Sequence, residues 1–273
     1  MLLIRTTSVD PALRAFIEQL ARASGDTPVI AADEQNGVVD AAPYPKIVVD
    51  RAACRRLGLY TPTDFAWRCG DYCFYVAAER YPDENAFWLI DFDARIACAS
   101  DFFKLAASHR EADLLVGYLA PAAPTWHWRN HASARDVEPW RCFFPVVRLS
   151  RRAIELLLHK RRSHSRQITR RRAWPNDEVF VATTMAASGL NLLDFNSMSE
   201  QPVCERETYS FRNVIKLSTF APTDERPRLY HPVLNDAAAG EKLDRISTPR
   251  TSAAGRSLLP WKLCQWINSV KRW

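Results

Sequence analysis

The stretch Phe87-Trp88-Leu89-Ile90-Asp91-Phe92-Asp93 joins an apolar run of strand-forming residues to two carboxylates one residue apart. Side chains at positions i and i+2 of a strand point to the same side, so Asp91 and Asp93 can converge where the strand ends. Two close carboxylates repel each other unless a cation lies beside them or one keeps its proton. Hard divalent cations such as Mg²⁺ and Mn²⁺ take oxygen ligands and bridge to phosphate. The stretch therefore predicts a metal and phosphate site at a strand end.

Strand and helix patterns alternate along the chain on both sides of this stretch. Strands are expected at residues 2–5, 29–32, 46–50, 87–91, 114–118, 143–149 and 192–195. Helices are expected to begin at Asp10, Asp71, Asp101, Ser150 and Asp177. Such alternation predicts an α/β fold with a mixed, mostly parallel central sheet flanked by helices. We expect one α/β domain over residues 1–235, followed by a linker and a basic amphipathic tail helix over 236–273.

Four aspartates lie at the ends of predicted strands. They are Asp33, Asp50, Asp91 and Asp93. Ligands of open α/β sheets bind in the crevice beyond the carboxyl ends of the strands. The shared position of these aspartates therefore predicts a polar binding site at that edge of the sheet.

The charge of the chain is concentrated in one belt. The net charge is +6, yet residues 148–172 hold ten Lys or Arg and one acid, Glu155, which leaves 27 basic and 30 acidic residues elsewhere. A basic belt attracts phosphate on a nucleotide, a nucleic acid or a lipid headgroup, or it is simply a solvated helix face. No glycine-rich dinucleotide motif and no P-loop motif occurs, which argues against those two nucleotide-binding classes.

Cysteine use and the C-terminal stretch bear on location. Seven cysteines form no CxxC pair and no secretory signal is evident, which predicts reduced thiols and a cytoplasmic protein. The tail from Ser257 to Trp273 carries apolar residues at helical spacing beside Lys and Arg. Such a helix either lies in a membrane interface, here the inner membrane face, or packs back on the body.

The longer phrase Phe87-Trp88-Leu89-Ile90-Asp91-Phe92-Asp93-Ala94-Arg95-Ile96 resembles the aromatic-Trp-hydrophobic-acidic-x-acidic-x-Arg/Lys phrase of several GT-A-type glycosyltransferases, whose acidic pair is the DXD motif. The order of later parts is similar too. A strand and helix segment at 143–162 precedes the acidic stretch Asn176-Asp177-Glu178, and His231 follows late in the chain. The resemblance covers roughly residues 1–235.

The resemblance implies a metal-dependent glycosyltransferase with a GT-A-like fold. Its nucleotide-sugar donor would lie across the strand ends, where Asp33 and Asp50 match the positions that meet the base and the ribose. Asp93 would ligate Mn²⁺ or Mg²⁺, Asp91 would bind the metal through water or touch the ribose, and His231 would be the third ligand.

The resemblance also assigns the acceptor side. Asp177 or Glu178 is similar to the acidic pair that faces the acceptor, and one of them would be the general base if the enzyme inverts. Arg171, within the Arg-rich segment 160–172, would hold diphosphate or an anionic acceptor. The acceptor would be a glycan or a lipid-linked glycan, as in the synthesis of a surface polysaccharide at the cytoplasmic face of a membrane.

Two other functions fit parts of the sequence. In a HAD-like phosphohydrolase, Asp91 would be the nucleophile and Asp93 the general acid, with Mg²⁺ bound and Asp177-Glu178 as the late acidic pair. The usual Gly-Thr continuation is missing, since Ala94-Arg95 follows Asp93. A non-enzymatic nucleic-acid-binding protein would use the belt at 148–172. No RRM, zinc-finger or helix-turn-helix phrase is present, so nucleic acid is not favoured as a partner.

Overall fold

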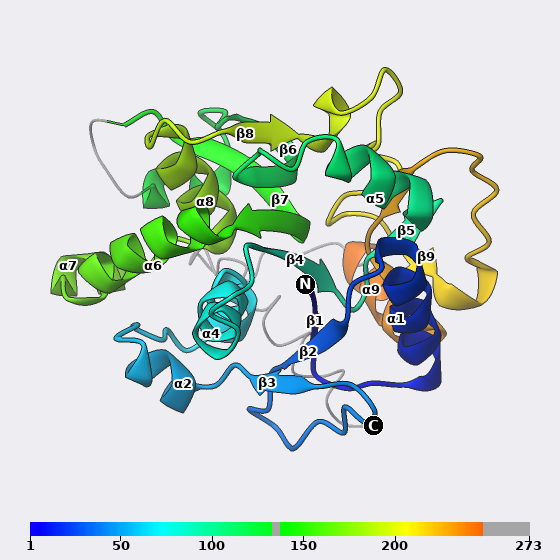
Figure 1. Cartoon of the computed structure of the whole chain (residues 1–273), viewed down its shortest axis with the longest axis horizontal. Helices are drawn as coiled ribbons and strands as arrows, with labels where there is room; N and C mark the ends of the chain where they lie inside the picture. The colour runs from blue at the N-terminus through cyan, green and yellow to red at the C-terminus, as the bar shows by residue number, and fades with distance from the viewer. Residues whose placement is uncertain (133–136, 248–273) are drawn as a thin grey trace.

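The computed structural model describes residues 1–132 and 137–247, and Figure 1 traces them in order. A seven-stranded sheet in the order β3-β2-β1-β4-β7-β6-β8 runs through the molecule. Only β7 is antiparallel to its neighbours β4 and β6; the other neighbouring pairs are parallel. This is the mixed, mostly parallel sheet that the sequence predicted. The strands are β1 (Leu2–Thr6), β2 (Pro28–Ala32), β3 (Lys46–Val48), β4 (Ala86–Asp91), β6 (Leu114–Pro121), β7 (Trp140–Ser150) and β8 (Leu192–Asp194).

The register of the central strands places charged residues side by side. In the parallel pairing of β1 with β4, Ile4 lies opposite Ile90 and Arg5 lies opposite Asp91. Because parallel strands end at the same edge of the sheet, Arg5, the one cation of β1, lies beside Asp91, the first aspartate of the acidic pair.

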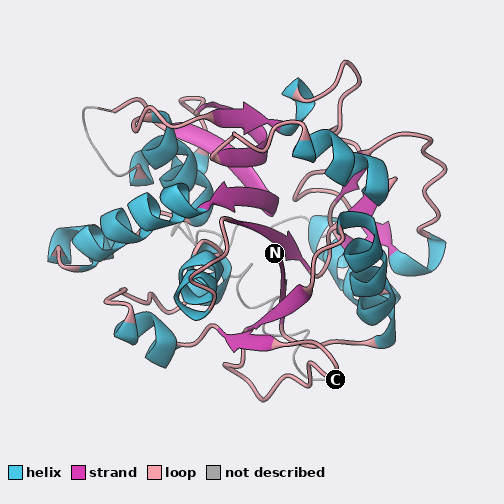
Figure 2. Cartoon of the chain, in the orientation of Figure 1, coloured by secondary structure: helices cyan, strands magenta, loops and turns pink. Residues whose placement is uncertain are grey.

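Helices cover both faces of the sheet, as Figure 2 shows. Strand side chains alternate between two cores: Leu3 belongs to one, and Leu2 and Ile4 belong to the other. The helices of the first core are α2 (Arg51–Arg56), α3 (Phe65–Arg68), α4 (Tyr72–Arg80), α6 (Arg151–Ser165) and α8 (Asp177–Ala186). Those of the second are α1 (Pro11–Ser24) and α5 (Ala99–Ala107).

The first helix follows the sequence signals closely. The Asp10 side chain accepts a hydrogen bond from the Leu13 N–H at 2.7 Å, and Pro11 is the first helical residue. Gly25 ends the helix with φ 75°, in the left-handed region that favours glycine. Its stripe of Leu13, Phe16, Ile17 and Leu20 is buried, and each such side chain stabilises the fold by roughly 1.5–3 kcal/mol.

The last described part of the chain forms a small layer beside the acidic pair. β5 (Arg95–Ala97) pairs with β10 (Arg228–Tyr230), and β9 (Ile215–Lys216) pairs with β11 (Val233–Leu234). Four other short elements are α7 (Ile168–Arg172) and the 3₁₀ turns η1 (His127–His131), η2 (Phe195–Ser197) and η3 (Leu217–Thr219).

A helix, α9 (Asp236–Ser247), occupies the first twelve residues of the segment expected to be a linker. Asn235 caps this helix by accepting the Ala238 N–H at 2.9 Å, and Ala238 and Ala239 are buried against Leu234. The tail helix and its membrane contact, predicted for 257–273, lie outside the described residues. Within the described ranges no helix is long and apolar enough to cross a membrane.

Candidate active site

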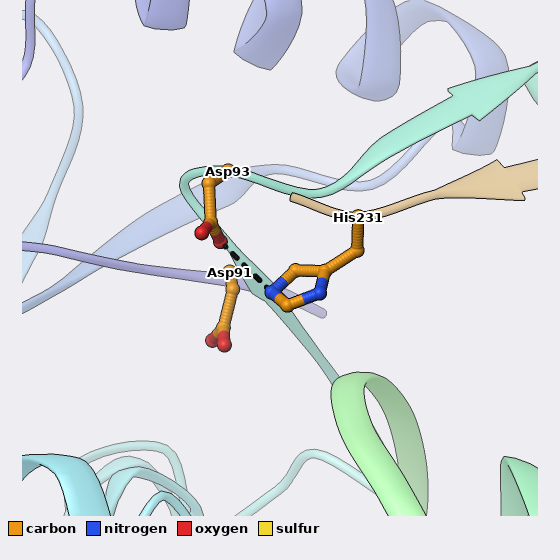
Figure 3. A group of neighbouring side chains, drawn as sticks. All are labelled: Asp91, Asp93 and His231. Carbon is orange, nitrogen blue, oxygen red and sulfur yellow. Dashed lines mark ion pairs between the residues drawn. The ribbon is translucent and has the colours of Figure 1, made fainter. Parts of the chain in front are cut away.

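Three side chains that are far apart in sequence meet just beyond the end of β4. Asp91 is the last residue of that strand, Asp93 follows in a tight turn, and His231 lies between β10 and β11. Their nearest ligand atoms all lie within 4.8 Å of one another. Figure 3 shows the imidazole directed at the two carboxylates, with His231 Nε2 3.4 Å from Asp93 Oδ1. The structure thus brings together the three residues predicted as metal ligands.

Backbone contacts fix this cluster in place. Arg95, which is buried, donates to the Phe92 carbonyl at 2.8 Å and to the Ala94 carbonyl at 2.7 Å, and so holds the turn that presents Asp93. The Val233 N–H donates to the Asp93 carbonyl at 2.7 Å. The segment that carries His231 is therefore tied to the acidic turn through the main chain.

The electrostatics of the cluster suit a cation. Burial raises the pKa of the Asp91 carboxyl above its ordinary range. Burial acts the same way on Asp93, but His231 and Arg5 outweigh it and lower the pKa of that carboxyl. The buried Nδ1 of His231 has no hydrogen-bond partner among the described residues, whereas Nε2 faces Asp93. Two carboxylates with one imidazole nitrogen are a donor set that a divalent cation can take.

Arg5 links the acidic pair to the candidate base. Its Nε donates to Asp91 Oδ1 at 2.6 Å and its Nη2 donates to Asp91 Oδ2 at 2.5 Å. Its Nη1 lies 3.9 Å from Asp177 Oδ2 and makes no hydrogen bond within the described chain. Burial disfavours the Arg5 charge, but the flanking carboxylates hold its pKa above the ordinary value. One guanidinium thus serves two buried carboxylates and keeps an N–H group without a partner.

The bidentate ion pair of Arg5 with Asp91 also bears on the phosphohydrolase alternative. A nucleophilic aspartate needs an oxygen free to attack phosphorus. Both oxygens of Asp91 accept strong, charge-assisted hydrogen bonds from Arg5. That arrangement favours a supporting carboxylate at position 91 over a nucleophile.

Gly70 lets Arg5 and Asp177 approach each other. The Gly70 N–H donates to Asp177 Oδ2 at 2.9 Å. A Cβ at this position would lie 2.1 Å from Arg5 Nη1 and 2.6 Å from Asp177 Oδ2. No real Cβ contact is that short, so the close approach requires glycine at position 70.

The acidic pair at the start of α8 has strongly perturbed titration. Asp177 is buried, and burial raises its pKa to about 7, although Arg5 acts in the opposite direction. Burial and the neighbouring Asp177 raise the pKa of Glu178 to about 8. A carboxyl group with a pKa near neutrality can exchange a proton at pH 7, which a general base requires. Of these two residues only Asp177 contacts Arg5, so Asp177 is the better placed to act as the general base.

A further cation lies beside the cluster on α9. Lys242 donates to the Phe211 carbonyl at 2.7 Å, and Asp93 is close enough to act on its charge. Burial lowers the pKa of Lys242 to about 8, against the effect of Asp93. Lys242 and Arg5 are thus two cations close to the predicted metal ligands.

The other strand-end aspartates differ in their surroundings. Asp33 lines a cavity of about 20 Å³ together with Arg5, Val49 and Phe65. The Asp50 side chain instead caps α2 by accepting the Ala53 N–H at 2.7 Å. Asp33 is therefore joined to the Arg5 site through a shared cavity, and ribose binding by Asp50 stays a prediction.

The basic belt is mostly engaged within the fold. Arg171 donates to the Ser165 carbonyl at 2.9 Å and 2.6 Å and lies over the Tyr60 ring. Six of its ten cations bind carbonyl or carboxylate oxygens, namely Arg148, Arg151, Arg152, Arg161, Arg162 and Arg171. The belt is less available to a polyanion than its composition indicated, and diphosphate binding by Arg171 stays a prediction.

Sequence reasoning missed Arg5, Gly70 and Lys242. A signal for Arg5 was present, because it ends an apolar strand that an α/β fold places beside the strand ending at Asp91. Gly70 is one of eight glycines and no motif distinguishes it. Lys242 lay in the segment expected to be a linker.

A scan against protein-family models finds no match, and a search of curated proteins also finds none. Solved structures do match. A glycosyltransferase involved in the glycosylation of the major capsid of PBCV-1 is 10% identical, with 58% of this chain and 65% of that chain covered and a TM-score of 0.33. The inositol-1-phosphate CTP transferase from T. maritima is 11% identical, with 93% and 98% covered and a TM-score of 0.40.

The galactosyltransferase LgtC, solved with donor and acceptor sugar analogs, is 11% identical, with 99% of this chain and 95% of that chain covered and a TM-score of 0.40. This chain spans less than two thirds of the capsid glycosyltransferase chain. The matching structures thus include glycosyltransferases and a nucleotidyltransferase.

Proposed function

We propose that the protein is a metal-dependent glycosyltransferase. It would move a sugar from a nucleotide-sugar donor to a hydroxyl of a glycan or lipid-linked acceptor. The observation that carries this proposal is the meeting of Asp91, Asp93 and His231 within 4.8 Å at the end of β4, with Arg5 bound to the first of them.

The surrounding charges support an anionic, diphosphate-containing donor. A divalent cation held by Asp93 and His231 would neutralise charge on the leaving diphosphate. Lys242 of α9 is close enough to Asp93 to interact with its charge, so its ammonium can meet a phosphate oxygen, while Arg5 adds positive charge behind Asp91.

If transfer inverts the configuration at the anomeric carbon, Asp177 would be the general base that activates the acceptor hydroxyl. The acceptor oxygen forms a bond to the anomeric carbon while the bond from that carbon to the diphosphate oxygen breaks. The hydroxyl proton passes to the Asp177 carboxylate, whose pKa of about 7 suits this transfer. The products are the glycosylated acceptor and a nucleoside diphosphate.

A panel of nucleotide sugars, tested with Mn²⁺ and with EDTA, examines this function. We expect one donor to raise the melting temperature and to release nucleoside diphosphate only when Mn²⁺ is present, since a ligand of the native state stabilises it. Release of pyrophosphate from a nucleoside triphosphate would instead show nucleotidyl transfer. Absence of any shift at millimolar donor with Mn²⁺ would contradict the proposal.

A further inference from the structure

A fully buried ion pair lies behind the candidate base. Arg161 of α6 and Asp71 beside α4 are both 0% exposed. Arg161 Nε donates to Asp71 Oδ2 at 2.7 Å and Nη2 donates to Asp71 Oδ1 at 2.9 Å, while the Tyr75 hydroxyl also donates to Oδ2. The guanidinium lies over the Phe180 ring, 3.7 Å from its centroid.

This pair joins the two segments that hold Asp177. Asp71 directly follows Gly70, whose N–H donates to Asp177 Oδ2. The third arm of Arg161, Nη1, donates to the Pro175 carbonyl at 3.0 Å, two residues before Asp177. One guanidinium therefore fixes both the donor of that hydrogen bond and the chain that carries its acceptor.

A buried ion pair contributes little net stability to a core, because removing two charges from water costs free energy and apolar residues of similar size commonly stabilise as well. Its distinctive property is geometric: a planar fork with three partners sets distances that apolar packing does not. We propose that the Arg161–Asp71 pair is a positioning device that holds the Asp177 carboxylate against the Gly70 N–H and the Arg5 guanidinium. For catalysis, this inference rests on the proposed role of Asp177 as the base.

The test replaces both charges at once. The double variant Arg161→Met with Asp71→Asn leaves no unpaired buried charge and keeps an acceptor for Tyr75. We expect its melting temperature to stay within a few degrees of the wild type. Two readouts are recorded: the amide proton resonance of Gly70 in a ¹H–¹⁵N spectrum, and kcat and KM for the donor.

We expect the Gly70 amide resonance to move upfield as its hydrogen bond to the carboxylate lengthens. We expect kcat to fall about tenfold or more, because misplacement by about 1 Å can cost about 100-fold, while the donor KM changes by less than about threefold. A folded double variant with an unchanged Gly70 resonance and unchanged kcat would overturn the proposal. A purely structural pair would give that result.

Two further proteins complete the design. Arg161→Lys keeps the charge but lacks the fork, so we expect the Gly70 resonance to move even if the double variant does not fold; an unchanged resonance in it also overturns the proposal. The control is the double variant Arg152→Met with Asp113→Asn, which removes another ion pair. Asp113 accepts a hydrogen bond from Ser150, and Ser150 lies opposite the first residue of β4, at the end of the strand away from Asp91. It should leave the Gly70 resonance and kcat unchanged.

The Gly70 readout needs no enzymatic activity. If the wild type transfers no sugar but the resonance moves in the variants, the positioning role stands and the proposed function fails. If the wild type is active but the resonance and kcat stay unchanged in the variants, the proposed function stands and the positioning role fails.

Discussion

Arg5 and Asp91 form a bidentate ion pair across neighbouring parallel strands, with N–O distances of 2.6 Å and 2.5 Å. The pair exists because β1 and β4 align in register, so that the last cation of one strand meets the last carboxylate of the other. Arg5 also reaches towards Asp177, and it thereby connects the predicted metal ligands to the candidate base.

Replacing Arg5 by Met should therefore destabilise the fold. The Asp91 carboxylate would stay buried without its cation, and breaking such a pair costs about 3 kcal/mol of unfolding free energy. Urea unfolding at pH 7 measures the loss. The matched control is Arg22→Met, which removes an exposed pair with Glu18 and should cost less than about 0.5 kcal/mol. Equal effects of the two substitutions would show that the Arg5 fork contributes no more than a surface pair.

Substituting Gly70 by Ala should disrupt the same region by sterics alone. The new Cβ would overlap Arg5 Nη1 and Asp177 Oδ2, so one of them must move. We expect a loss of about 2 kcal/mol, as for other overpacked sites, together with reduced transfer activity. Gly240→Ala is the control, because nothing lies within 4 Å of its Cβ and alanine favours the helix there by about 0.5–1 kcal/mol. Normal stability and activity of Gly70→Ala would contradict the described approach.

The raised pKa of Asp177 predicts a pH-dependent stability. Its folded value of about 7 exceeds the ordinary value of 3.8, so the native state keeps a proton that the unfolded state has released. Its contribution to the unfolding free energy is present in full below about pH 4 and falls by at most about 1.4 kcal/mol per pH unit up to pH 7. Asp177→Asn carries no such proton. The wild-type free energy minus that of the variant should thus fall between pH 5 and pH 7 in urea unfolding, and a constant difference would refute the raised pKa.

Lys242→Gln should weaken the binding of the donor without destabilising the fold. Its ammonium is one of two cations near the predicted metal ligands, and losing one charge-assisted contact to phosphate costs about tenfold in affinity. Titration calorimetry with a nucleoside diphosphate and Mn²⁺ measures this. Lys104→Gln, at an exposed lysine paired with Asp101, serves as the control and should bind as the wild type does. Equal affinities of both variants would remove Lys242 from the site.

Local sequence signals predicted the sheet and the acidic pair well. The run ending at Asp91 and the cap at Asp10 each act through neighbours in sequence, and the structure confirms the strand and the helix that they predicted. Asp91, Asp93 and His231 also meet in space, although their role as metal ligands stays a prediction.

The remainder of the site depends on contacts between distant segments. Gly70 is needed only because Arg5 and Asp177 come from elsewhere to meet over it, and no local pattern records that. The charge count of the belt likewise did not reveal that Arg161 is fully buried, because burial is decided by packing against Asp71 and Phe180. The helix α9 was missed since its short apolar face, Ala238 and Ala239, resembles a flexible alanine-rich segment.

The central claim is that Asp93 and His231 bind a divalent cation together with the diphosphate of a donor. Its most direct test is titration calorimetry of a nucleoside diphosphate, with and without Mn²⁺, on the wild type, Asp93→Asn, His231→Ala and the control Asp83→Asn, whose side chain is exposed. We predict Mn²⁺-dependent binding by the wild type and the control, and affinity lower by about 100-fold or more in the two site variants. Equal, Mn²⁺-independent binding by all four proteins would contradict the claim.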